Sequence, residues 1–151
     1  MNNESADILI VEDNQNDALL TIRSLKQHNL ASSLVHVTDG QAAIDYLFAK
    51  GAYSERNPLN LPKVVLLDLK LPKLNGLEVL SLIRGDPRTQ ILPVVILTSS
   101  QEESDLIESY KLGANSYIVK PVEFENFSKA IHEVGLYWLL LNKPPVKAIS
   151  Q

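Results

Sequence analysis

The chain has 151 residues with 45% hydrophobic and 21% charged side chains, which fits one folded domain and excludes intrinsic disorder. Its net charge of −4 argues against nucleic acid as a main partner, because phosphate backbones attract clustered Lys and Arg. The absence of cysteine excludes a disulfide scaffold, a thiolate metal site and a cysteine nucleophile. The N-terminus is polar and the apolar runs are too short to span a bilayer, so we expect a soluble, cytoplasmic protein without a membrane partner.

Short apolar runs alternate with amphipathic stretches, a pattern typical of βα units around a parallel sheet. Runs rich in Val, Ile and Leu predict strands at Asp7–Val11, Leu34–Val37, Val64–Leu67, Val94–Leu97 and Ser116–Val119. Near-continuous apolar strands are expected where helices cover both faces of a sheet. The sequence therefore predicts a doubly wound α/β fold around a five-stranded parallel sheet.

The first three helices are predicted from polar capping residues followed by apolar side chains at helical spacing. Asn14 or Asn16 caps the first helix, and Asp39-Gly40 begins the second. Asn75 begins the third, where Glu78 three residues later completes a capping box.

Two further helices are predicted in the C-terminal part. Ser100 and Glu103 repeat the capping-box pattern for the fourth helix, and Gly113 ends it in the left-handed conformation. The fifth helix is expected over residues 123–141. Its apolar stripe consists of Phe124, Phe127, Ile131, Val134 and Trp138. Residues 136–141 remain apolar where the helix should be ending, and such a patch often marks an interface, so we expect a homodimer through the last helices.

One domain is predicted over residues 7–141, between a flexible N-terminus at 1–6 and a C-terminal tail at 142–151. The helix before the tail must end there, because Pro144 and Pro145 cannot continue it. Residues 49–62 form a long polar link that a minimal βα repeat does not require, and the sequence alone assigns it no role.

Polar side chains follow four of the predicted strands, at the sheet edge where open parallel sheets bind ligands. Glu12 and Asp13 follow the first strand, Asp68 the third, Thr98 the fourth and Lys120 the fifth. Clustered carboxylates repel one another, and a hard cation such as Mg²⁺ relieves that repulsion. Lysine neutralises further anionic charge, and a threonine hydroxyl can donate to a phosphoryl oxygen. These groups suit an aspartate nucleophile that accepts a phosphoryl group.

Four segments stand in a specific order and spacing. They read ILIVEDN at 8–14, LLDLKLPKLNG at 66–76, VILTS at 95–99 and GANSYIVKP at 113–121. In these segments the chain resembles bacterial response-regulator receiver domains, and the similarity covers residues 7–138. The resemblance implies a flavodoxin-like (CheY-like) fold and a role in two-component phosphorelay signalling.

The resemblance also implies how a phosphoryl group is accepted. Asp68 would take it from a phosphohistidine of a sensor histidine kinase. Asp13, Asp68 and the backbone carbonyl of Lys70 would bind Mg²⁺, and Glu12 would act mainly through a bound water. Many familiar receivers carry Asp at the position of Glu12, but the longer side chain keeps the charge.

Further roles are implied for residues near the acceptor. Thr98 and Lys120 would bind the phosphoryl oxygens. Tyr117 and Thr98 would form the conformational switch, and the bond between Lys120 and Pro121 would be cis. The protein would not be an enzyme beyond promoting its own Mg²⁺-dependent phosphorylation and dephosphorylation.

A closer resemblance comes from the link at 49–62, the segment at 67–73 and the long last helix. These features are similar to those of single-domain regulators paired with cyanobacterial and bacterial phytochrome kinases. We therefore expect a phytochrome-type kinase as partner. No output domain is expected after the fold, so other proteins should read the signal.

Three other functions fit the sequence less well than that of a receiver. Phosphatases with an aspartyl-phosphate intermediate usually place a second carboxylate two residues after the nucleophile, where this chain has Lys70. A nucleotide-binding protein is disfavoured because neither a Gly-x-Gly-x-x-Gly nor a Walker loop is present. An interaction module that is never phosphorylated would be favoured by loss of Asp68 or Lys120, and both are present.

Overall fold

The computed structural model describes residues 6–30, 33–121 and 123–140. Its strands form a five-stranded, fully parallel sheet in the order β2-β1-β3-β4-β5. They are β1 (Ile8–Val11), β2 (Leu34–Val37), β3 (Val64–Leu67), β4 (Val94–Thr98) and β5 (Ser116–Val119). The predicted α/β fold is confirmed, and two strand boundaries differ from prediction by one residue.

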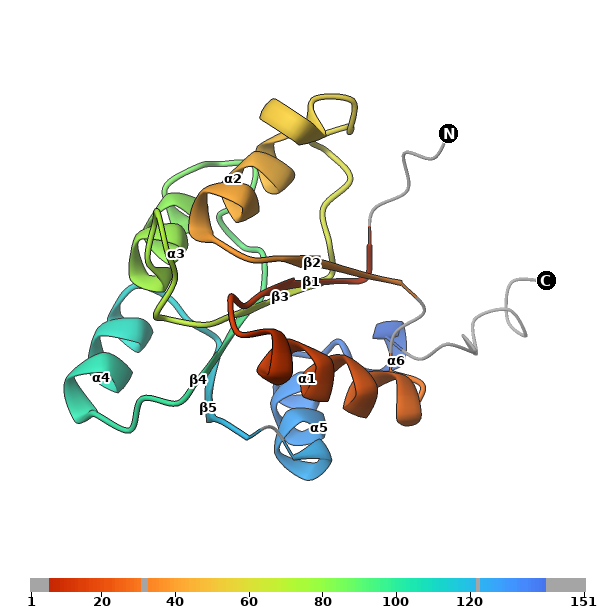
Figure 1. The fold of residues 1–151 in the computed structure, drawn as a ribbon, viewed down its shortest axis with the longest axis vertical. Coiled ribbons are helices and arrows are strands. Elements are labelled where there is room, and N and C mark those ends of the chain that lie inside the picture. Colours follow the sequence, from red (N-terminus) through yellow and green to blue (C-terminus); the bar gives the residue numbers. More distant parts are fainter. Residues whose placement is uncertain (1–5, 31–32, 122, 141–151) are drawn as a thin grey trace.

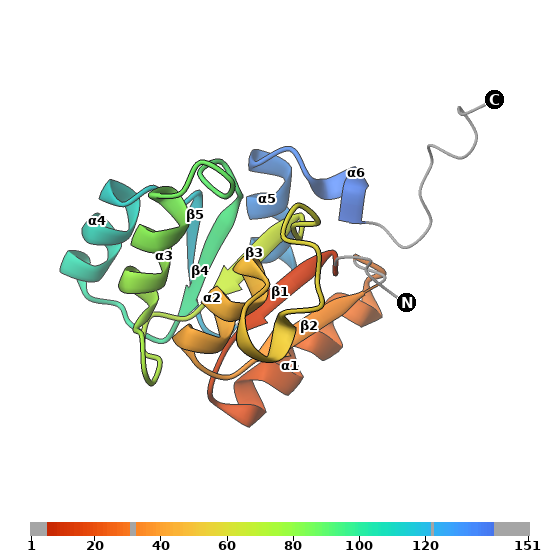
Figure 2. The same ribbon diagram turned by 90° about the horizontal axis from the view of Figure 1, so that it is seen from above.

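Helices cover both faces of the sheet. They are α1 (Gln15–Gln27), α2 (Gly40–Phe48), α3 (Gly76–Arg84), α4 (Glu103–Lys111), α5 (Phe124–Glu133) and α6 (Tyr137–Leu140). α1 and α5 lie on one face, and α2, α3 and α4 on the other (Figure 1). Figure 2 shows the strands from above, with β2 at one edge and β5 at the other.

Successive residues of each central strand contribute to different cores. Ile8 and Ile10 of β1 pack in the cluster on the α1 and α5 side, whereas Leu9 and Val11 pack in the cluster on the α2 and α3 side. All four are at most 2% exposed. Side chains alternate between faces along a strand, so two covered faces require a continuous apolar run.

The predicted caps of the first three helices are present. The Asn14 side chain accepts from the Asp17 amide at 2.9 Å, and Asp39 caps α2 in the same way. Asn75 and Glu78 form both bonds of a capping box, each 2.9 Å long. These bonds satisfy amides at the helix start that have no partner inside the helix, so local sequence is enough to position the helix start.

The predicted capping box of the fourth helix is wrong. α4 begins at Glu103, and its N-cap residue Glu102 makes no side-chain capping bond. The Ser100 hydroxyl instead donates to Asp105 at 2.5 Å and accepts from the Glu102 amide at 3.3 Å. α4 begins only at Glu103, so Ser100 lies too early in the chain to be its N-cap residue. Its hydroxyl instead stabilises the turn between β4 and α4. Gly113, with φ of +101°, follows α4 in the left-handed region as predicted.

The prediction of one continuous last helix is also wrong. α5 ends at Glu133, and the four-residue α6 begins at Tyr137. Gly135 lies between them with φ of +77°, the left-handed conformation that commonly ends helices. Leu140 is buried, whereas Leu139 is 52% exposed, so the predicted apolar patch is exposed only in part.

The rest of the predicted stripe follows its helical spacing. Phe127 and Ile131 are buried, and Phe124 and Val134 are half-buried. The side chain of Trp138 lies outside the described part of the chain, as do the predicted flexible N-terminal residues 1–5 and all of the C-terminal tail.

The link at 49–62 is tied to α2. It contains the short 3₁₀ helix η1 (Gly51–Tyr53). The Arg56 guanidinium donates to the backbone carbonyls of Tyr46 and Asn60, and its carbon lies 3.9 Å from the centre of the Tyr46 ring. The planar guanidinium group thus stacks on the Tyr46 ring and donates hydrogen bonds to two backbone carbonyls at once. These contacts hold the link in place although most of it has no regular secondary structure.

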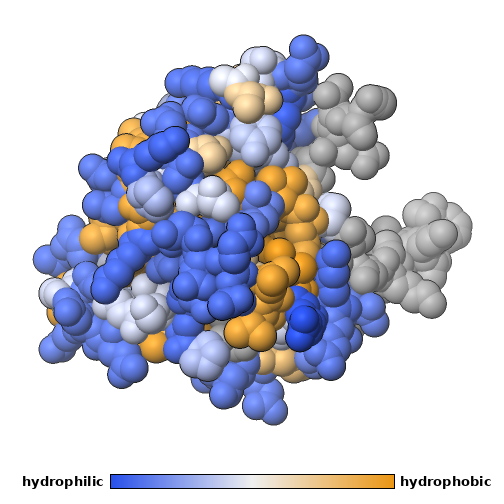
Figure 3. All heavy atoms as spheres, in the orientation of Figure 1, coloured by the Kyte–Doolittle hydropathy of each residue, from blue (hydrophilic) through white to orange (hydrophobic). Residues whose placement is uncertain are grey.

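Apolar exposure is not confined to the last helices. Leu19 and Leu20 of α1 are each 56% exposed, and Ile107 and Tyr110 of α4 are 46% and 48% exposed. The face drawn in Figure 3 is mostly hydrophilic, with apolar side chains gathered in a band that runs from top to bottom to the right of its centre. In the described ranges no helix has the length and apolar character needed to cross a membrane.

Arg84 at the end of α3 holds two turns together. Its guanidinium donates to the carbonyl of Gly113 at 3.0 and 2.7 Å, to the carbonyl of Leu92 at 2.7 Å and to the Asn115 side chain at 3.0 Å. The turn after α4 and the turn before β4 are thereby fixed to the same helix end.

We expect Arg84→Ala to lower the free energy of unfolding by about 3 kcal/mol, because several charge-assisted hydrogen bonds are lost together. Chemical denaturation measures this loss. Arg88→Ala is the matched control, since Arg88 pairs with Asp86 at the surface and its removal should cost much less stability than that of Arg84. Equal losses for the two variants would contradict the role given to Arg84.

Candidate functional site

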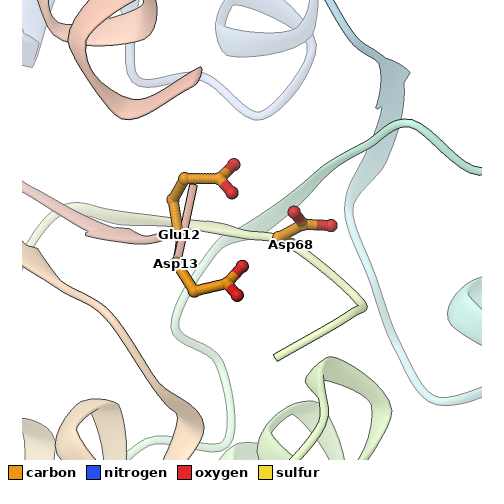
Figure 4. Close-up of side chains that lie close together, drawn as sticks. All are labelled: Glu12, Asp13 and Asp68. Carbon is orange, nitrogen blue, oxygen red and sulfur yellow. The ribbon is translucent and has the colours of Figure 1, made fainter. Parts of the chain in front are cut away.

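Three carboxylates meet at the carboxyl edge of the sheet. Glu12 and Asp13 follow β1, and Asp68 follows β3, which pairs directly with β1. One oxygen of each lies within 4.8 Å of the others. Figure 4 shows the three side chains leaving the strand ends toward a common space. Glu12 and Asp68 are buried and Asp13 is exposed, so the cluster opens to solvent on the Asp13 side.

Lys120, which follows β5, reaches across the strand ends to this cluster. Its Nζ lies 2.8 Å from Glu12 Oε1, 2.9 Å from Asp68 Oδ2 and 2.7 Å from Asp17 Oδ2. The Lys120 side chain is only 8% exposed. Glu12, Asp68 and Lys120 are therefore brought together as predicted, and the peptide bond between Lys120 and Pro121 is cis, also as predicted.

The two oxygens of Asp68 have different partners. Oδ1 accepts from the Leu69 amide at 2.7 Å and from the Lys70 amide at 3.4 Å. Oδ2 accepts from Lys120 Nζ. The backbone thus fixes Oδ1, whereas Oδ2 faces the Lys120 ammonium, a cation that can stabilise an incoming anion, which makes Oδ2 the oxygen better placed to react.

Thr98 and Tyr117 lie beside the carboxylates but are not hydrogen-bonded to each other. Thr98 ends β4, is fully buried, and its Oγ1 accepts from the Ser100 amide at 3.3 Å. The Tyr117 hydroxyl donates to the Ser100 carbonyl at 3.2 Å, and burial raises the pKa of that hydroxyl. Ser100 therefore links the two residues predicted to form the switch.

This arrangement can be compared with known proteins. A family model described as the response regulator receiver domain matches residues 8–132. The chain belongs to this receiver family. The match includes every residue predicted for the site, from Glu12 to Lys120.

Three relatives are similar over most of this receiver. FilR2 of Methanothrix harundinacea, a probable methanogenesis regulatory protein, is 41% identical over 91% of this chain and 86% of its own. Response regulator Rcp1 of Synechocystis is 39% identical over 87% of this chain and 88% of its own. The Mn²⁺-bound structure of Rcp1 superimposes with a TM-score of 0.72, with 36% identity over 90% of this chain and 94% of that chain.

The third relative is the bacteriophytochrome response regulator AtBRR. Its structure has a TM-score of 0.82 and 51% identity, covering 93% of this chain and 99% of that chain. The receiver is thus homologous to phytochrome-associated response regulators of two-component signalling, as the sequence resemblance predicted.

Asp17 is a site residue that the sequence analysis missed. It lies in the first turn of α1, where Asn14 caps the helix and fixes the Asp17 amide. The available signal was an acidic residue four positions after Asp13 and inside a capped first turn. That signal is weak, because acidic residues are common in first turns, where they interact favourably with the helix dipole.

Glu12 and Lys120 have pKa values that are shifted by burial and by the neighbouring ionisable groups. The pKa of Glu12 is raised to about 7, mainly by burial and to a smaller extent by the nearby Asp68, although the hydrogen bonds from Lys120 and from the Asn14 amide oppose this rise. Burial lowers the pKa of Lys120, but hydrogen bonds to Asp17, Glu12 and Asp68 outweigh burial and raise it above its ordinary value. Lys120 is therefore cationic at neutral pH, while Glu12 is close to its titration point.

Glu12 should make the stability of the metal-free receiver depend on pH. Its pKa is 4.5 ordinarily and about 7 in the folded state, so the folded protein keeps a proton that the unfolded chain releases. The stability contributed by this proton is present below about pH 4.5 and is lost as the pH rises through about 7. We expect a loss on the order of 3 kcal/mol.

Chemical denaturation at about pH 5 and about pH 8 measures this dependence. Glu12→Gln removes the titrating group, so the variant should lose less stability than the wild type between the two values. Equal losses in the two proteins would contradict the shifted pKa. Added Mg²⁺ should reduce the wild-type loss, because a cation favours the ionised carboxylate.

The donor set fits a hard divalent cation. Glu12, Asp13 and Asp68 supply carboxylate oxygens, the ligands that Mg²⁺ and similar ions prefer. Asp13 and Lys70 also line a pocket of about 400 Å³ that gives access from solvent. The carbonyl of Lys70 stays a prediction as a further ligand.

Proposed function

We propose that this receiver accepts a phosphoryl group on Asp68 from a sensor histidine kinase and passes the signal to other proteins. The contact between Asp68 Oδ2 and Lys120 Nζ inside the carboxylate cluster carries this proposal. A nucleophilic carboxylate, a cation to stabilise the incoming anion and a cluster of oxygen ligands are what phosphoryl transfer to aspartate requires.

Mg²⁺ is the metal that we propose. Asp13 and Asp68 would bind it directly with the Lys70 carbonyl, and Glu12 would act through a bound water. The Mn²⁺-bound structure of Rcp1 supports a divalent cation in a related receiver. When bound, the metal neutralises charge on the transferring phosphoryl oxygens and on the carboxylates around them.

The transfer is a substitution at phosphorus. Asp68 Oδ2 forms the new P–O bond while the P–N bond to the kinase histidine breaks, and the electron pair of that bond stays on the imidazole nitrogen. Lys120 donates to a phosphoryl oxygen, and Thr98 donates its hydroxyl to another. The surrounding backbone amides keep Oδ1 in place, so the carboxylate does not rotate away from the phosphorus.

The acyl phosphate is removed by water, which returns Asp68 to a free carboxylate. We therefore propose that the protein promotes only its own phosphorylation and dephosphorylation and acts on no separate substrate. While it lasts, the phosphoryl group draws Thr98 toward Asp68 and leaves room for Tyr117 to turn inward. The conformations of the α4 and β5 surface shift in population as a result.

A phytochrome-type histidine kinase is the partner that we propose. The similarity of this receiver to AtBRR, a bacteriophytochrome response regulator by name, supports this assignment. A cytoplasmic location follows from such a partner. A homodimer through the last helices stays a prediction, although α5 and α6 are separate helices and Leu140 is buried.

Phosphotransfer from a purified kinase tests the proposal. A phytochrome-type kinase labelled on its histidine is mixed with the receiver and Mg²⁺, and the label on each protein is followed with time. We expect label to leave the kinase and to appear on the receiver within minutes. Label that stays on every phytochrome-type kinase tested but moves from other histidine kinases would reject the partner and keep the receiver function.

A further inference from the structure

Asp17 has no part in the proposed transfer, yet it makes the shortest of the three carboxylate contacts of Lys120. Its Oδ2 lies 2.7 Å from Lys120 Nζ, compared with 2.8 Å for Glu12 and 2.9 Å for Asp68. The Asp17 side chain is 35% exposed, whereas those of Lys120 and Glu12 are 8% and 6% exposed. Asp17 therefore ties the ammonium group to helix α1 from the solvent side.

The hydrogen-bonding capacity of Lys120 is fully used in this arrangement. An ammonium group has three N–H donors and no acceptor, and the three carboxylates take one donor each. When Asp68 Oδ2 becomes the bridging oxygen of the acyl phosphate, it loses its charge and accepts hydrogen bonds only weakly. The donor that it releases is then available to a phosphoryl oxygen, while Glu12 and Asp17 keep the other two.

We propose that Asp17 is a positioning residue, which with Glu12 holds two donors of Lys120 so that the third points at the phosphoryl acceptor. The side chain of lysine is a flexible four-carbon stem, so an ammonium held only by Glu12 samples positions away from Asp68. Asp17 acts through Lys120 and touches neither the phosphoryl group nor the metal. The inference rests on the proposed function, because it concerns the same transfer.

The sign of a substitution effect separates positioning from simple charge. Asp17 adds negative charge beside a site that must receive an anionic phosphodonor, so a purely electrostatic role predicts faster phosphorylation when Asp17 is removed. Positioning predicts the opposite. With acetyl phosphate and saturating Mg²⁺, we expect Asp17→Ala to slow labelling about tenfold, the size typical of partners that orient a functional group. Asp17→Asn keeps an acceptor oxygen, so its labelling rate should lie between those of the wild type and Asp17→Ala.

Two comparisons make this test specific. Glu123→Gln removes the same charge from an exposed residue three positions after Lys120 in the sequence and should leave the labelling rate unchanged. In a Lys120→Ala background, Asp17→Ala should have no further effect, because its target is already absent. Mg²⁺ affinity, measured by fluorescence or calorimetry, should change less than about twofold in Asp17→Ala, since Asp17 is not a proposed ligand.

A second readout does not depend on phosphorylation. Thermal unfolding of the metal-free wild type, both single variants and the double variant forms a cycle that reports the coupling of Asp17 to Lys120. We expect Asp17→Ala to lower Tm in the wild type and not in Lys120→Ala. Faster labelling of Asp17→Ala, or an equal effect in both backgrounds, would overturn the inference. A wild type that is never labelled would refute the proposed function instead, and the metal-free cycle would then decide the role of Asp17.

Discussion

Asp68→Asn is expected to abolish phosphorylation of the receiver by both a histidine kinase and a small phosphodonor. The amide oxygen of asparagine carries no charge and is a poor nucleophile, so the P–O bond cannot form at this position. Nearby carboxylates do not replace it. Asp13 is exposed, and Glu12 is engaged with Lys120 and the Asn14 amide. Intact-mass measurement after incubation with Mg²⁺ and acetyl phosphate gives the labelled fraction.

Asp86→Asn is the matched control for this prediction. It makes the same chemical change at the surface, where Asp86 pairs with Arg88 away from the cluster. The control should be labelled as fast as the wild type. Label that persists on Asp68→Asn would place the acceptor elsewhere and contradict the assignment.

Lys120→Ala is expected to slow phosphorylation and to lower the free energy of unfolding. Loss of a charged group that stabilises the transferring oxygens should slow labelling by about 10²–10³-fold. In the metal-free protein, removal of the cation leaves Glu12 and Asp68 buried without a counter-charge, which should cost about 3 kcal/mol of unfolding free energy. Mg²⁺ should restore part of this stability, because it supplies positive charge to the same carboxylates.

Denaturation with and without Mg²⁺ measures the stability change, and intact mass measures the rate. Lys63→Ala is the matched control, since its side chain is 42% exposed and pairs with Asp7 at the surface. We expect it to cost less than about 1 kcal/mol and to leave labelling unchanged. A Lys120→Ala protein as stable as the control, with no added response to Mg²⁺, would contradict the charge balance described for the cluster.

The sequence predicted most of the site because the site is built at strand ends. An apolar run is easy to recognise, and the residue that follows it in a parallel sheet lies at the binding edge. Glu12, Asp68, Thr98 and Lys120 are each positioned in this way. The first three helix starts were predictable for a similar reason, since a cap depends on residues only three positions apart.

The missed features depend on contacts between distant segments. Asp17 meets Lys120 across 103 positions of sequence, and Arg84 meets Asn115 across 31, and neither pairing leaves a local pattern. The break after α5 had a local signal in Gly135, but the apolar spacing on both sides of it favoured one continuous helix. Packing decided that conflict, because α6 buries Leu140 against the core on the α1 and α5 side.

The central claim is that Asp68 forms an acyl phosphate in a Mg²⁺-dependent reaction. Reduction with borohydride marks an acyl phosphate permanently, so peptide mapping of the reduced wild-type protein locates it. After incubation with acetyl phosphate, we predict a single mark on Asp68 that forms in the presence of Mg²⁺ and does not form when a chelator is present during the incubation. A mark on another residue, or labelling that ignores the metal, would contradict the account.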